Sequence, residues 1–135
     1  MFTTEQIKAA HSKVKSGADF PAYIREIKAL GVTHYVAYVA DGRINYYGAD
    51  DSTAKLPAKY EPLAIADRAN GEALKAGLLA HQQGKTDFLV FIKMCATCGI
   101  EKWEICMEEM TCTYYDSAAN KILVETIPGV APVPI

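Results

Sequence analysis

The sequence lacks the features that mark several large classes of protein. No stretch approaches the ~20 apolar residues of a membrane-spanning helix, and the N-terminus has neither the basic start nor the apolar run of a secretory signal. The net charge is −2 at pH 7, and Lys and Arg are scattered. No basic stripe is therefore present to bind a phosphate backbone. These absences predict a cytoplasmic protein that binds neither membranes nor nucleic acid.

Familiar catalytic motifs are missing as well. The sequence contains no glycine-rich phosphate loop, no GxSxG or HExxH, and no kinase or dinucleotide-binding fingerprint. The histidines form no motif: His11 and His81 fall near the apolar faces of predicted helices, as partly buried structural histidines do, and His34 opens a predicted strand. We therefore predict no catalytic residue and no cofactor.

The cysteines are the next candidates for chemistry. In a cytoplasmic protein Cys95, Cys98, Cys106 and Cys112 default to reduced thiols. The pair Cys95-Ala96-Thr97-Cys98 is a CxxC, but it falls in the last turn of a predicted helix, where the dipole disfavours a thiolate. A zinc site needs about two more ligands. Packed thiols without metal or disulfide are the favoured interpretation, with a metal site and a redox pair as alternatives.

What the sequence does contain is a repeat of itself. With 135 residues, 50% of them hydrophobic, the chain is long enough for one domain with its own core. An offset of about 68 positions, which we call the repeat offset, aligns Asp19-Phe20 with Asp87-Phe88, Ile24 with Ile92, Gly31 with Gly99, Tyr35 with Trp103, and Tyr46-Tyr47 with Tyr114-Tyr115. We interpret this as an internal duplication of halves 3–66 and 70–127.

Each half begins with two predicted helices. Thr3 and Gln6 form a capping box for the first helix, and the second begins at Asp19 and ends at Gly31. In the second half, Asn70 and residues 86–87 take the same capping roles. Tyr35 and Trp103 each lie shortly after a helix-ending glycine, and we expect each to pack on the second helix of its own half.

Strands follow the helices in each half. Asp41-Gly42 predicts a two-residue hairpin turn that pairs Val39 with Ile44 and Ala37 with Tyr46. We expect a third strand within residues 58–66, a second hairpin over 101–108 and 110–116, and a last strand over 121–127. The predicted fold is a single α+β domain, residues 1–135, of two related αα-βββ halves with antiparallel strands covered by helices. The Pro-rich tail, 128–135, is predicted to be a loose or surface-draped end.

One face of these hairpins is unusual. In the first hairpin His34, Val36, Tyr38 and Tyr47 alternate with the core positions, and this face is too apolar for plain solvent. The matching face of the second hairpin is more polar. The candidate binding surface comprises His34, Val36, Tyr38, Tyr47, Glu104 and Tyr115. A covering helix or tail, a self-association surface and a ligand pocket are the three interpretations left open.

Several residue strings resemble a known family. They are Met1–His11, Lys15–Ile24 and Tyr38–Gly42 in the first half, and His81–Asp87, Gly99–Trp103 and Met110–Asp116 in the second. On these strings the chain, up to Pro128, resembles the bacterial and prophage-borne domain of unknown function often labelled "phage envelope protein". The resemblance implies a bacterial or prophage origin and supplies no activity, cofactor or site residue.

The function predicted from the sequence is therefore binding rather than catalysis. The leading hypothesis is a non-enzymatic module that associates with itself, as a homodimer or larger homo-oligomer, or with another protein. The alternative is a small-molecule binder or enzyme with a pocket between the two halves, for which His34, Tyr38, Tyr47, Glu104 and Tyr115 are the candidate walls.

Overall fold

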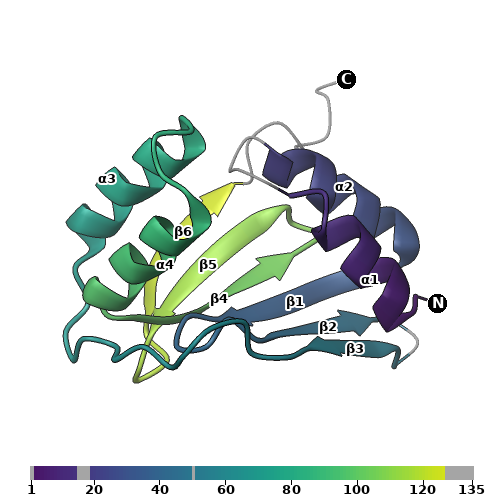
Figure 1. Ribbon diagram of the computed structural model, residues 1–135, viewed down its shortest axis with the longest axis horizontal. Helices are drawn as coiled ribbons and strands as arrows, with labels where there is room; N and C mark the ends of the chain where they lie inside the picture. The colour runs from purple at the N-terminus through teal and green to yellow at the C-terminus, as the bar shows by residue number, and fades with distance from the viewer. Residues whose placement is uncertain (1, 15–18, 50, 127–135) are drawn as a thin grey trace.

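A computed structural model describes residues 2–14, 19–49 and 51–126 (Figure 1). Within these residues the chain forms four helices and a six-stranded antiparallel sheet, so the predicted α+β class is confirmed. The elements in chain order are α1 (Thr4–His11), α2 (Phe20–Leu30), β1 (Val32–Tyr38), β2 (Ile44–Gly48), β3 (Thr53–Leu56), α3 (Gly71–Gln82), α4 (Phe88–Thr97), β4 (Ile100–Cys106), β5 (Thr111–Asp116) and β6 (Lys121–Thr126). The predicted Pro-rich tail, 128–135, lies outside the described residues, as does Ile127.

The helices begin where the capping residues predict, and α2 ends at the predicted Gly31, whereas α1 ends at His11, earlier than the predicted stop at Ser16-Gly17. The Thr3 hydroxyl accepts a hydrogen bond from the Gln6 backbone N–H, and the Gln6 side chain accepts one from the Thr3 N–H, which completes the capping box. Asn70 and Asp87 cap α3 and α4 through their side-chain oxygens. Gly99 follows α4 with φ +78°, a left-handed conformation that glycine adopts without strain.

All strands join one sheet with the order β3-β2-β1-β4-β5-β6. Strands β1 and β4 lie at its centre and pair antiparallel, so the two halves of the chain meet there (Figure 1). The strands β3 and β6 form the two edges. The sheet is therefore continuous from the first half to the second.

The helices pack on one face of this sheet (Figure 1). The Tyr35 ring meets Tyr23 of α2 at 6.3 Å between centroids, and the Trp103 ring meets Phe91 of α4 at 5.7 Å. These contacts confirm that each aromatic packs on the second helix of its own half. Tyr46 is fully buried in the same layer, where its hydroxyl is hydrogen-bonded to that of Tyr23. We call the opposite face, which is turned away from the helices, the outer face.

The two hairpins have the same register when the repeat offset is applied. Strands β1 and β2 pair Tyr35 with Tyr46, and strands β4 and β5 pair Trp103 with Tyr114. A register shift falls between residues 32 and 34 in the first hairpin and between 100 and 102 in the second. Because a β-bulge is a specific feature of a strand pair, the equal positions strengthen the case for the duplication, which stays a prediction.

The central strand pair adds two-fold symmetry to this agreement. Tyr35 lies opposite Ile105, and Ala37 lies opposite Trp103. Under the repeat offset each of these pairs becomes the other, so the pattern is symmetric about the pair of Val36 and Glu104. Two copies of one half, paired through their first strands, produce this register.

Two sequence predictions about strands were wrong, and the first concerns the third strand. It is Thr53–Leu56 rather than part of 58–66, because Ala54 and Leu56 alternate with exposed neighbours and face the core. Within 58–66, the Leu63 N–H donates to the Ala40 oxygen at 2.7 Å, so this segment crosses the end of the first hairpin. Its Pro62 and the preceding Pro57 disfavour a paired strand there.

The second wrong prediction is the two-residue turn of the first hairpin, because the observed turn is wider. Ala37 lies opposite Ile44, and Tyr35 opposite Tyr46, two residues away from the predicted pairing. The loop closes through the Gly42 N–H, which donates to the Tyr38 oxygen at 3.0 Å. A shift of two residues keeps every side chain on its predicted face, so the assignment of faces was right.

Candidate functional site

The six predicted surface residues come together on the outer face. All six are half-buried, and none belongs to the core. They occupy four neighbouring strands: Tyr47 on β2, His34, Val36 and Tyr38 on β1, Glu104 on β4, and Tyr115 on β5. Val36 and Glu104 lie opposite each other at the centre. Their use in binding stays a prediction.

His34 is held in one orientation by its neighbours. Its ring stacks on Tyr47 at 4.7 Å between centroids with 13° between the planes. The Thr33 hydroxyl donates its only hydrogen to the Tyr47 carbonyl oxygen at 3.1 Å, so it accepts from His34 Nδ1, 3.2 Å away. This assigns a proton to His34 Nδ1 as the donor of that hydrogen bond.

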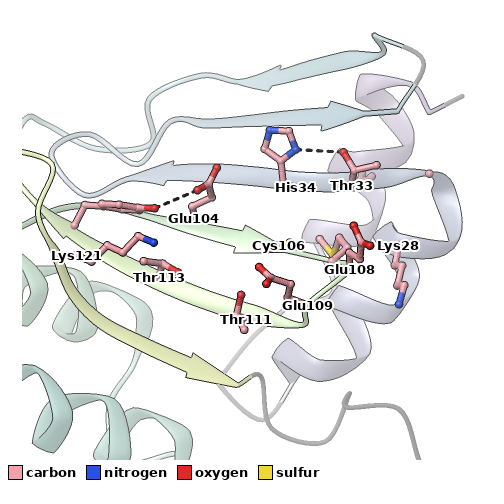
Figure 2. A pocket seen from close by; sticks show the side chains of 14 residues that line it. Lys28, Thr33, His34, Glu104, Cys106, Glu108, Glu109, Thr111, Thr113 and Lys121 are labelled. Carbon is pink, nitrogen blue, oxygen red and sulfur yellow. Dashed lines mark hydrogen bonds between the residues drawn. The ribbon is translucent and has the colours of Figure 1, made fainter.

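Glu104 forms a polar contact at the centre of the outer face. The Tyr115 hydroxyl donates to Glu104 Oε1 at 3.3 Å (Figure 2). Partial burial and then the negative charge of Glu104 raise the pKa of the Tyr115 hydroxyl. The tyrosine therefore stays protonated and remains the donor at neutral pH.

Two tyrosines of the outer face lie beneath cations. The Arg43 guanidinium is 4.2 Å from the Tyr38 ring centroid, and Lys102 Nζ is 5.5 Å from that of Tyr115. The repeat offset relates the pair of Lys102 and Tyr115 to the stacked pair of His34 and Tyr47. In each half, a nitrogen-bearing side chain therefore contacts the ring of the equivalent outer-face tyrosine, Tyr47 in the first half and Tyr115 in the second.

An open groove of about 780 Å³ runs over the central strands and β5 (Figure 2). Its walls include three of the six predicted residues, His34, Glu104 and Tyr115. The other lining residues are Lys28, Gly31, Val32, Thr33, Cys106, Met107, Glu108, Glu109, Thr111, Thr113 and Lys121. Val36, Tyr38 and Tyr47 lie outside the groove, although they share its face.

Charge is divided along this groove. Glu108 and Glu109, both exposed in the turn between β4 and β5, form what we call the acidic end (Figure 2). Lys121 lines the other end, and Lys102 lies across from Tyr115 on the neighbouring strand; these two lysines are the basic end. Lys28 of α2 reaches the acidic end from the helix layer. The groove is therefore polar along its length.

The four cysteines occupy very different environments. All are free thiols in the described part of the chain, and Cys95, Cys98 and Cys112 are buried. Burial raises the pKa of each of these three thiols, most of all for Cys95 and Cys112. Cys106 is half-buried, lines the groove and lies opposite His34 on the neighbouring strand. It is the accessible thiol.

The described residues also bear on metal binding and on membrane crossing. Among them, no three His, Cys, Asp or Glu side chains gather closely enough to hold a metal ion. None of the described helices has both the length and the apolar composition that crossing a bilayer requires.

His11 and His81 have packing roles away from the outer face. The His11 ring packs edge-on against Tyr23, and its Nε2 is 3.0 Å from Lys59 Nζ. Burial and then the charge of Lys59 lower the pKa of His11 to about 4. His81 stacks on Phe91 at 4.3 Å, and burial lowers its pKa. Both imidazoles are therefore neutral parts of the helix layer at pH 7.

Comparison with known proteins gives a family and one similar protein. The model of the family described as "Protein of unknown function (DUF1398)" matches residues 8–126. The chain is also similar to a protein of Escherichia coli (strain K12) described as "Uncharacterized protein YcgX". The two are 22% identical over 120 residues, which cover 89% of this chain and 90% of that protein.

Proposed function

The chain belongs to the DUF1398 family, and we propose that it is a non-enzymatic binding protein whose outer face contacts another protein molecule. The proposal includes a cytoplasmic location, which four free thiols support. A bacterial or prophage origin is also part of it and is supported by the similar protein in Escherichia coli.

One observation carries this proposal. A two-layer α+β protein needs only one buried sheet face, and here the helices cover that face. The outer face nevertheless carries Val36, Tyr38 and Tyr47 as half-buried neighbours on β1 and β2. Tyrosine is enriched at protein interfaces because its ring is apolar and its hydroxyl forms hydrogen bonds. A patch of this kind on a hydrated surface commonly has a partner.

The polar groups beside this patch support binding over catalysis. His34 Nδ1 donates to Thr33, and Glu104 accepts from Tyr115, so each already has a partner within the face. The net charge of −2 and the acidic end of the groove disfavour a nucleic-acid partner. A protein surface with complementary polar groups is the partner that fits best.

Two matched lysine substitutions test which face binds. Val36→Lys places a charge at the centre of the outer face, and Leu79→Lys places one in the helix layer, where Leu79 is 56% exposed. The measurement is the fluorescence anisotropy of labelled protein, dilute and in an extract of its source cells. We expect anisotropy to rise in the extract for the wild type and Leu79→Lys and to stay low for Val36→Lys.

Thermal melts establish that both variants are folded. If Leu79→Lys removes the rise and Val36→Lys keeps it, the helix layer is the binding surface and the proposal is wrong. If the wild type shows no rise in extract and no association when concentrated, binding to a protein is wrong as well.

The groove supports a second candidate function, the binding of a small molecule. Its volume of about 780 Å³ falls within the range of ligand pockets, and His34, Glu104 and Tyr115 line it from both halves of the chain. A thermal-shift screen of metabolites separates this function from the first. A ligand of the groove raises the melting temperature of the wild type and does so less for Glu104→Gln.

A further inference from the structure

We propose that the partner on the outer face is a second copy of this chain, turned end for end so that the acidic end of each copy faces the basic end of the other. This inference rests on the proposed function and names its partner. It is carried by the division of charge along strands β4 and β5.

The charges of the outer face are arranged for such a pairing. Glu108 and Glu109 are exposed at one end of the β4–β5 hairpin, whereas Lys121 is exposed at the other end beside Lys102. A copy rotated about an axis that crosses the strands brings opposite charges together twice, once at each end. A copy rotated about an axis parallel to the strands brings the two acidic ends together, which is unfavourable.

The other charges at these ends do not cancel the pattern. Asp116 lies near the basic end and keeps its negative charge, because hydrogen bonds from Asn120 and Ala118 lower its pKa, but the two lysines leave an excess of positive charge there. Arg43 is paired with Asp41 at 3.4 Å. Lys28 belongs to α2 and reaches the acidic end from the side of the helices. The exposed charges at the two ends are therefore Glu108 and Glu109 in the β4–β5 turn and Lys121 on β6, with the half-buried Lys102 on β4, while Glu104 at the centre accepts a hydrogen bond from Tyr115.

The centre of the face supplies the apolar part of the interface. Val36, Tyr38 and Tyr47 lie on β1 and β2 beside the charged strands, with Tyr38 opposite Lys102, and are half-buried in the single copy. Six strands ~4.8 Å apart, each about six residues long at ~3.3 Å per residue, give the outer face a projected area of roughly 600 Å². A standard stable interface buries ~800 Å² per partner, so the dimer is expected to be weak and dependent on concentration.

Charge reversal and mixing test this arrangement by sedimentation equilibrium. One variant carries Glu108→Lys and Glu109→Lys, and the other carries Lys102→Glu and Lys121→Glu. Each variant alone has like charges at both ends, so we expect each to dimerise roughly 10-fold or more weakly than the wild type. Mixed in equal amounts, the two variants are expected to form a heterodimer, since opposite charges then meet at both ends.

Control variants distinguish a failure of the proposed dimer from a failure of protein binding by the outer face. Glu72→Lys reverses an exposed charge on α3 and is expected to leave the dimer unchanged. A wild type that stays monomeric when concentrated, or variants that dimerise as it does, overturn the second copy as partner. If Val36→Lys still removes binding in the cell extract, the proposed function stands with a different protein as partner.

Discussion

Replacing Trp103 with alanine is expected to lower the free energy of unfolding by about 3 kcal/mol, the low end of the range for a large aromatic. The Trp103 ring packs against Phe91 of α4 and lies 6.1 Å from the Tyr114 ring, so its removal leaves a space between α4 and the sheet. The low end applies because the side chain is half-buried rather than fully buried. Urea melts of the purified variant measure the loss.

Tyr47→Ala is the matched control on the other face of the sheet. Tyr47 is also a half-buried aromatic on a strand, but its stacking partner is His34 of the outer face. Cross-strand pairs of this kind contribute about 1 kcal/mol or less. A loss as large as that of Trp103→Ala means that the outer face is part of the core, and the assignment of faces is then wrong.

Gly99→Ala is expected to destabilise the fold by roughly 3 kcal/mol or more, from strain and steric overlap together. A Cβ at Gly99 lies 2.5 Å from the Arg68 carbonyl oxygen and 2.9 Å from the Ala69 Cα, which are backbone atoms. This backbone cannot move away freely, because the Asn70 N–H donates to the Cys98 oxygen at 2.8 Å. The midpoint of urea unfolding reports the loss.

Gly84→Ala isolates the contribution of backbone strain. Gly84 has φ +76° and Gly99 has φ +78°, so alanine is strained equally at both positions. A Cβ at Gly84 meets no atom within 4 Å. Its substitution is therefore expected to cost about 1–2 kcal/mol. Equal losses for the two variants contradict the close approach of residues 68–69 to the end of α4.

The sequence predicts the local structure of this chain well because its signals are local. Thr3, Asn70 and Asp87 are capping residues whose side chains reach a backbone N–H three residues on. Period-two alternation assigned the faces of the strands, and a wrong hairpin register did not disturb that assignment because the error was two residues. Helix caps and strand alternation can both be recognised from residues that are close together in the sequence.

The third strand was harder because its signal is short. Thr53–Leu56 is a strand of 4 residues, and only Ala54 and Leu56 face the core. The longer apolar stretch after it, with Leu63 and Ile65, packs against the core without pairing in the sheet. Burial alone therefore did not separate a strand from a crossing loop.

The candidate site depends on a contact that no local pattern contains. Strands β1 and β4 belong to different halves of the chain, and their pairing brings His34 opposite Cys106 and Val36 opposite Glu104. The sequence predicted which residues share a face within each hairpin. It also placed residues of both hairpins on one candidate surface, but it did not predict the pairing of β1 with β4 that joins them, or that Lys28 of α2 reaches the end of the groove.

The reactivity of Cys106 tests most directly whether the outer face binds protein. Cys95, Cys98 and Cys112 are buried and report only unfolding, whereas Cys106 lies in the groove and is only half-buried. In dilute protein we expect one thiol, Cys106, to react rapidly with N-ethylmaleimide. In the concentrated protein or in the cell extract its reaction is expected to slow, because a bound surface covers the groove. An unchanged rate for Cys106 under all three conditions contradicts a protein-binding role for the outer face.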